Sequence, residues 1–348
     1  MEKPALFGIE HSNRDKKGFW GKNMFNSSFP VALANYMKES NKKAIYIFLN
    51  EELKTETREI DISEVYNCGT TSSKDLYFSF ESKYVPYSKF AYDDIGNIDL
   101  VVKNLNGDFL RPLEVKLTVL PDSASCKKAE DKWGSEVVIR PATTSYCALG
   151  IANACETEFP KIRTIFEDTC IKIRDWSNPT EILAAYPSLL ECVNTFEKDF
   201  LHIQSPLIMQ PIWKTKGQSP ILAENAFDIY IWSDLAFTRL FLDSAIETPI
   251  TRQMRCTARL ARCLFELSRV GKVSLRDIYK QMTFDLQTDK EFSANGAITN
   301  KHMANPRLTK PLITRDELYN IILNNGEDLL KPERRFDQSI YFTMKRNG

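Results

Sequence analysis

Three charged side chains flank a predicted β-turn near residue 106. Residues 98–102 and 113–120 are rich in aliphatic residues, and the Asn106-Gly107 pair between them is a strong signal for a β-hairpin. If this pair forms a two-residue turn, residues with numbers adding up to 213 face each other, so Asp99 faces Glu114. Directly opposed residues lie ~4.5–5.5 Å apart at Cβ, so the two carboxylates repel each other unless a cation lies between them. Lys116 follows on the same face, whereas the alternate residues from Leu113 to Val119 turn toward apolar packing.

Such a group is suited to metal-assisted hydrolysis of a phosphodiester. Oxygen ligands from Asp99 and Glu114, with the backbone carbonyl of Val115, match the preference of Mg²⁺ for one or two carboxylates completed by water and phosphate. Lys116 then acts as the catalytic base or as a stabilising charge. Its position beside two carboxylates and a phosphate keeps the ammonium protonated, which favours water positioning and charge stabilisation.

Two features of the sequence weaken this motif. Glu-x-Lys alone is a common pattern on exposed strands, and the chain has a second copy at Glu81-Ser82-Lys83 with no matching Asp hairpin. Pro112 falls opposite Val101 and cannot donate to the strand ladder, so it indicates an edge strand or a β-bulge. A bulge at this point would shift the register by one residue and separate Asp99 from Glu114.

The other elements must position this hairpin. We predict strands at 44–49, 136–140, 200–213 and 227–232, a strand or short helix at 75–80, and a helix that starts after Ser27 and Ser28. Residues 141–144 offer N-cap candidates for a helix over 145–155, and the chain beyond 235 is mostly helical, with 251–269 the best amphipathic segment. The sequence therefore predicts an α/β or α+β fold. We expect a core over 1–235 with an N-terminal extension, and a helical C-terminal extension over 236–348, packed as one elaborated domain.

Composition excludes several other classes of protein. The chain has 348 residues with no apolar run of the ~18 that a membrane helix needs, and its first thirty residues lack a signal-peptide core, so we expect a cytoplasmic protein without membrane contact. Its eight cysteines contain no Cys-x-x-Cys motif, as in proteins with reduced thiols rather than zinc sites. Acidic and basic residues both number 46, so only their local distribution can indicate a polyanionic partner.

The motif residues also resemble those of a known nuclease family. Asn97-Ile98-Asp99 and Leu113-Glu114-Val115-Lys116 resemble the PD-(D/E)xK signature, with Ile98 where proline is often found. Further segments resemble the HindVP-like type II restriction endonucleases, namely Phe7-Gly8, 11–15, 20–23, 25–30, 113–122 and 135–141. The resemblance implies a restriction-endonuclease-like core with a central mixed sheet flanked by helices. It also implies a Mg²⁺-dependent homodimer that cuts double-stranded DNA at a short palindrome of the GRCGYC kind.

Candidate DNA contacts lie in several polar segments. Residues 251–280 hold eight basic side chains and two acidic ones, and four of the arginines form a helical stripe that suits a phosphate backbone or, equally, a solvated face. The N-terminal segment and a polar loop around Gly217 also carry donors, whereas Arg140 is explained slightly better by an ion pair with Glu136. The candidates are Asn13, Arg14, Lys22, Asn23, Arg140, Lys214, Lys216, Gln218, Arg252, Arg255, Arg259 and Arg262.

Two other functions fit the same residues. One is a structure-specific or repair nuclease that uses the same hairpin. The other is a DNA-binding protein without catalysis, in which Asp99, Glu114 and Lys116 form a solvated strand face. Cleavage of a plasmid into discrete fragments, cleavage of branched DNA alone, and binding without cleavage distinguish the three.

Overall fold

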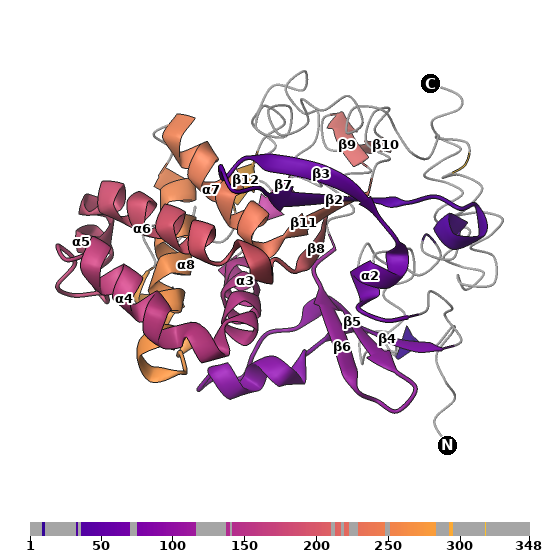
Figure 1. Cartoon of the computed structure of the whole chain (residues 1–348), viewed down its shortest axis with the longest axis horizontal. Helices are drawn as coiled ribbons and strands as arrows, with labels where there is room; N and C mark the ends of the chain where they lie inside the picture. Colours follow the sequence, from indigo (N-terminus) through magenta and orange to yellow (C-terminus); the bar gives the residue numbers. More distant parts are fainter. Residues whose placement is uncertain are drawn as a thin grey trace.

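The fold is a mixed α/β arrangement, with strands gathered at one end and helices at the other (Figure 1). This confirms the predicted class of a mixed sheet flanked by helices, as in a restriction-endonuclease-like core. The computed structural model describes residues 9–10, 33, 36–69, 75–115, 137–139, 141–209, 213–216, 219–222, 229–247, 251–282, 292–294 and 317. No helix within these ranges is both long and apolar enough to cross a bilayer.

One four-stranded sheet carries the predicted hairpin. Its order is β1 (Ile9–Glu10), β4 (Leu76–Ser82), β5 (Ile98–Asn104) and β6 (Phe109–Leu113). β1 runs parallel to β4, whereas β4, β5 and β6 are antiparallel to one another. The segment predicted as a strand or a short helix at 75–80 is thus a strand.

A second four-stranded sheet has the order β3 (Thr55–Ile60), β2 (Ala44–Leu49), β11 (Tyr230–Ser233) and β8 (Pro206–Met209). β2 has the predicted bounds. The predicted strand over 200–213 is wrong for Leu201–Ile203, which form a 3₁₀ helix. The reason is that Phe200 still donates its N–H to Phe196, so the preceding helix continues into a tighter turn. Two short pairs, β7 (Val137–Ile139) with β12 (Phe292–Ala294) and β9 (Trp213–Lys216) with β10 (Ser219–Leu222), are both antiparallel.

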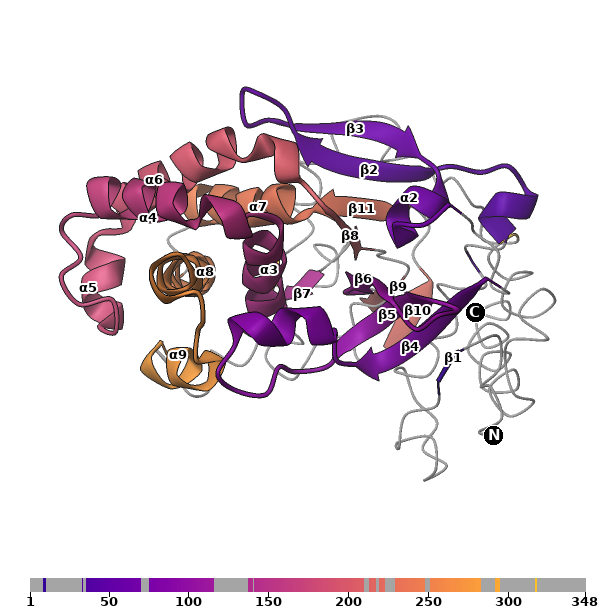
Figure 2. The ribbon, with the colours of Figure 1, turned by 60° about the horizontal axis from the view of Figure 1, so that its bottom comes forward.

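Most of the helices pack around a single central helix. Figure 2 shows α8 (Thr251–Val270) almost end-on, with the other long helices around it. Helices in contact with α8 are α3 (Pro141–Ala154), α4 (Phe159–Thr169), α5 (Pro179–Ala184), α6 (Tyr186–Asp199), α7 (Asp234–Glu247) and α9 (Leu275–Gln281). The short helix α2 (Ile62–Tyr66) and a 3₁₀ helix at Val85–Phe90 lie beside the sheets.

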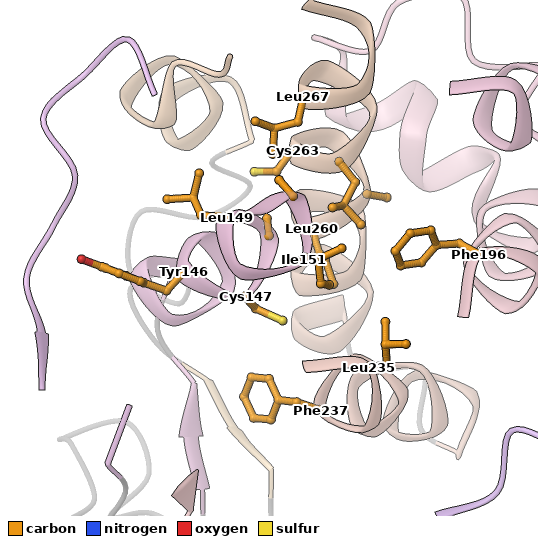
Figure 3. Close-up of a cluster of buried hydrophobic side chains, with 14 of the residues drawn as sticks. Tyr146, Cys147, Leu149, Ile151, Phe196, Leu235, Phe237, Leu260, Cys263 and Leu267 are labelled. Carbon is orange, nitrogen blue, oxygen red and sulfur yellow. The ribbon is translucent and has the colours of Figure 1, made fainter. Parts of the chain in front are cut away.

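A central part of the hydrophobic core lies between α3, α6, α7 and α8 (Figure 3). Leu260, Cys263 and Leu267 of α8 face Leu149 and Ile151 of α3, and all five are at most 2% exposed. The predicted helix 251–269 is confirmed, but it is buried on nearly every side from Thr257 to Ser268 rather than lying on the surface. The helices of the C-terminal part and those of the N-terminal part therefore share one core.

The hairpin differs from the prediction at the turn and agrees with it at the acidic residues. The loop contains three residues rather than two, because Asn104 N–H bonds to Asp108 O (3.1 Å) and Gly107 adopts a positive φ of 87°. A β-bulge then leaves Leu110 unpaired, since Lys103 pairs with Phe109 while Val102 pairs with Arg111.

The two departures cancel. The extra loop residue shifts the pairing by one position and the bulge shifts it back, so Leu100 faces Leu113 and Val101 faces Pro112, as predicted. Pro112 needs no ladder partner on its outer side, because β6 is at the edge of the sheet among the described strands. The bulge lies between the turn and Pro112, so the predicted register holds where the acidic residues lie.

A buried carboxyl group, that of Asp234, lies where α7 meets α3 and the segment before β8. Asp234, the first residue of α7, accepts a hydrogen bond from Ser205 Oγ (2.6 Å) and is 8% exposed. Gly150 of α3 permits this contact, because a Cβ there would lie 3.0 Å from Asp234 Oδ2 and 3.1 Å from Tyr87 Oη. Burial raises the pKa of Asp234 to about 7, against the opposing effects of Ser205 and Arg111.

The raised pKa of Asp234 predicts a pH dependence of stability. Between pH 3.8 and about 7 the folded protein holds a proton that the unfolded chain releases, so the free energy of unfolding should fall as pH rises through this range. Asp234→Asn should remove this loss, which urea unfolding of both proteins at several pH values would measure. The same pH dependence in the variant would contradict the assignment.

Candidate active site

Asp99 lies near the start of β5 and is half-buried between two buried apolar neighbours, Ile98 and Leu100. Its Oδ2 accepts a hydrogen bond of 2.8 Å from the backbone N–H of Val115, which is across the hairpin. A carboxylate held by a backbone donor has a defined position, because neither partner can move without moving a strand. This contact attaches Asp99 to the chain segment that directly follows β6.

Glu114 follows the last residue of β6 and is also half-buried. Because Leu100 faces Leu113, the next position of the same register sets Glu114 across from Asp99. Thr143 in the first turn of α3 donates its hydroxyl to Glu114 Oε1 at 3.1 Å, and Thr143 is 4% exposed. Two carboxylates thus lie on one face of the hairpin. A backbone N–H holds Asp99, and a helix side chain holds Glu114.

The opposite face of the hairpin is apolar next to the carboxylates, as predicted there. Leu113 is fully buried and Val115 is 2% exposed. Because side chains alternate along a strand, the two residues that flank Glu114 turn into the core while Glu114 turns to the other face. Among the described residues no group of three or more His, Cys, Asp and Glu side chains forms a metal centre, so a metal at Asp99 and Glu114 would need other ligands.

The first turn of α3 is fixed from its other side by α9. Ser145 and Tyr279 share a hydrogen bond of 2.5 Å between their hydroxyls. Arg259 of α8 lies over the Tyr279 ring, 6.0 Å from its centroid, and donates to Met282 O at 2.9 Å. Glu114 is thus in contact with a helix turn that is held by the central helices.

Comparison with known proteins identifies the family. The family model of the HindVP restriction endonuclease matches residues 20–346. The chain belongs to the HindVP restriction endonuclease family. It is 38% identical to the type II restriction enzyme HgiDI of Herpetosiphon aurantiacus over 349 residues, which cover 99% of this chain and 97% of that enzyme.

A second relative supports the same assignment. The probable type II restriction enzyme HindVP of Haemophilus influenzae is 34% identical over 346 residues, which cover 97% of this chain and 93% of that protein. No solved structure matches the chain. Membership of the HindVP family confirms the predicted resemblance and the predicted class, a type II restriction endonuclease that acts on double-stranded DNA.

Several candidate residues of this HindVP family member lie outside the described residues. They include Lys116, the third residue of the predicted catalytic group, which follows directly after Val115. Among the predicted DNA contacts they are Asn13, Arg14, Lys22, Asn23, Arg140 and Gln218. For Arg252 and Arg255 the structure describes the backbone, which belongs to α8.

The predicted arginine stripe is wrong for two of its four members. Arg259 and Arg262 are 5% and 9% exposed, so they do not form a surface stripe. Arg259 bonds to the backbone at Met282, and Arg262 pairs with Glu266 one helical turn away. The reason is that other helices enclose α8, so both arginines are buried and make their contacts inside the protein.

The polar loop predicted around Lys214 is also different. Lys214 and Lys216 belong to β9, and their partners across the hairpin are Ile221 and Ser219 of β10. Gly217 and Gln218 lie between the two strands in sequence.

The sequence indicates Thr143 only as a helix-capping candidate and does not reveal its contact with Glu114. This contact predicts that Thr143→Val lowers the cleavage rate about 10-fold or more, because the Glu114 carboxylate loses the donor that orients it. Valine keeps the shape of the side chain and removes only its hydroxyl. Rates at saturating DNA, with thermal unfolding of the same protein, would measure this.

Thr143→Ser is the matched control, because it keeps the hydroxyl and loses the methyl group. We expect it to cleave at close to the wild-type rate. Equal rates for the Val and Ser variants would show that the hydroxyl does not orient Glu114.

Proposed function

We propose that this enzyme hydrolyses phosphodiester bonds of double-stranded DNA in a Mg²⁺-dependent reaction at a PD-(D/E)xK active site of Asp99, Glu114 and Lys116. The observation that carries the proposal is the pair of carboxylates on one hairpin face, with Asp99 bonded to Val115 N–H and Glu114 bonded to Thr143. Two acidic groups held this close favour a cation between them.

The donors of this pair fit a hard divalent cation. Asp99 and Glu114 supply carboxylate oxygens, and the backbone carbonyl of Val115 is a further oxygen donor in the same segment. Mg²⁺ prefers one or two carboxylates and takes water and phosphate oxygens at its remaining positions, which agrees with the lack of a third acidic ligand among the described residues. When bound, the metal would polarise the phosphate and lower the pKa of a coordinated water.

Lys116 is proposed to act on the same phosphate. It directly follows Val115 and is two residues beyond Glu114, so alternation sets it on the face of the carboxylates. Its ammonium, kept protonated by the neighbouring negative charges, would orient the attacking water and stabilise charge on the phosphate oxygens.

The site is proposed to be a short palindrome of the GRCGYC kind, which implies a homodimer. A two-fold symmetric sequence presents the same bases to both protomers, so one active site can act on each strand. Contacts to DNA are proposed from the N-terminal segment, Arg140, Lys214, Lys216, Gln218, Arg252 and Arg255. Digestion of a plasmid of known sequence, followed by sequencing of the ends, would distinguish this site from other sequences and from cleavage of branched DNA.

The proposed site predicts the effect of removing either carboxylate. Asp99→Ala and Glu114→Ala should each abolish cleavage, because the metal contributes several kcal/mol to stabilising the transition state. Both variants should bind duplex DNA at least as tightly as the wild type, since the phosphate contacts remain and negative charge is removed. Plasmid cleavage and gel-shift assays would measure the two properties, and near wild-type turnover of either variant would overturn the site.

A parallel prediction concerns Lys116. Lys116→Ala should lower turnover far more than affinity, because its charge is needed most as the transition state forms. Lys83→Ala is the matched control, since Lys83 also ends a Glu-x-Lys motif but pairs with Asp94 at the protein surface. We expect the control to cleave normally. A loss of turnover in the Lys83 variant alone would show that the catalytic lysine belongs to the Glu81-Ser82-Lys83 motif instead.

A further inference from the structure

The surface of α9 and the turn before it carry three exposed basic side chains. Lys272, Arg276 and Lys280 are all exposed, and within the described part of the chain none of them forms an ion pair. Lys272 lies beside Tyr92, with its ammonium 5.9 Å from the ring centroid, and Tyr92 is 62% exposed. Cations without acidic partners are available to an anionic ligand.

Two of these cations lie on one face of α9. Arg276 and Lys280 are four residues apart, so they lie on the same face of α9 about 6 Å apart along the helix axis. Leu275, Ile278 and Met282 are buried on the other face. The spacing of about 6 Å is close to the rise of two nucleotides along one strand of DNA, at about 3.4 Å each.

Nearby acidic groups are mostly occupied. Asp93 accepts hydrogen bonds from Ser274 Oγ (2.7 Å) and from the backbone N–H of Arg276 (3.0 Å). Glu266 pairs with Arg262 and Arg269. Asp277 is exposed on α9 itself, so the three basic residues from Lys272 to Lys280 outnumber this acid by two.

The same helix is connected to the candidate active site. Tyr279, between Arg276 and Lys280 in sequence, bonds to Ser145 in the first turn of α3, and Thr143 of that turn bonds to Glu114. The start of α3 therefore contacts both α9 and the Glu114 carboxylate, through residues two positions apart. Figure 2 shows α9 below α8 and beside the 3₁₀ helix at Val85–Phe90, which precedes β5 in the chain.

We propose that Lys272, Arg276 and Lys280 form a DNA-backbone contact surface that binds phosphates flanking the cleaved bond. This inference rests on the proposed function, since it takes the substrate to be duplex DNA held over Asp99 and Glu114. In the basic segment 251–280, the proposed DNA contacts are thus these three exposed residues and not the buried Arg259 and Arg262. The surface binds phosphates and not bases, so it adds affinity and salt dependence without sequence preference.

The test is the salt dependence of DNA binding. A triple variant with Lys272→Gln, Arg276→Gln and Lys280→Gln is titrated with two short duplexes, one containing GACGTC and one without it, in EDTA so that no cleavage occurs. We expect weaker binding to both duplexes. The logarithm of the association constant falls linearly with the logarithm of the salt concentration. The magnitude of this slope should decrease by about 0.9 for each phosphate that the variant no longer neutralises, or about 2 to 3 in total. Fluorescence anisotropy over a range of salt concentrations measures both.

The matched control removes the same number of charges outside α9. Lys172 and Arg174, between α4 and α5, and Lys198 in α6 are exposed, and their replacement by Gln changes the net charge equally. If the two triple variants show the same slope, or if the α9 variant keeps the wild-type slope, the surface does not bind DNA. Failure of the wild type itself to bind either duplex would instead overturn the proposed function, and the surface with it.

Discussion

The candidate site depends on one hydrogen bond, from the backbone N–H of Val115 to the carboxylate of Asp99. It joins an acidic side chain of β5 to the segment that carries Glu114, beyond the last residue of the paired strand β6. Like charges at opposed positions destabilise a hairpin. A backbone donor offsets part of that repulsion and holds Asp99 in place, so the pair remains in position to share a cation.

Packing of the helices supports the second carboxylate. Thr143 reaches Glu114 from the first turn of α3, and Ser145 in the same turn is held by Tyr279. Arg259 extends this contact to the central helix α8. The position of Glu114 is therefore linked to the hydrophobic core between α3, α6, α7 and α8, and a carboxylate supported in this way loses little conformational entropy when it binds a ligand.

Local patterns predicted the hairpin, β2 and the central helix from sequence, because alternation and helical periodicity are properties of short segments. The pairing register of β5 with β6 was predicted correctly near Asp99, although the predicted two-residue turn is not the one observed. The three-residue loop and the bulge at Leu110 each change the pairing by one residue, and neither is visible in the Asn106-Gly107 signal. Arg259 and Arg262 were predicted at the surface because periodicity gives the faces of a helix but not the helices that cover them. Thr143 could not be found from sequence, since its role depends on a contact with a residue 29 positions away.

The central claim is that Asp99 and Glu114 hold one cation together. The most direct measurement is calorimetric titration of Mn²⁺, used in place of Mg²⁺, into the enzyme bound to an uncleavable duplex. Asp99→Asn, Glu114→Gln and the double variant are compared with the wild type. We expect each single substitution to abolish the same binding event, and the double variant to show no further reduction, because both oxygens serve one ion. If each carboxylate removes a separate binding event, or if either substitution leaves Mn²⁺ affinity unchanged, the two residues do not form a shared metal site.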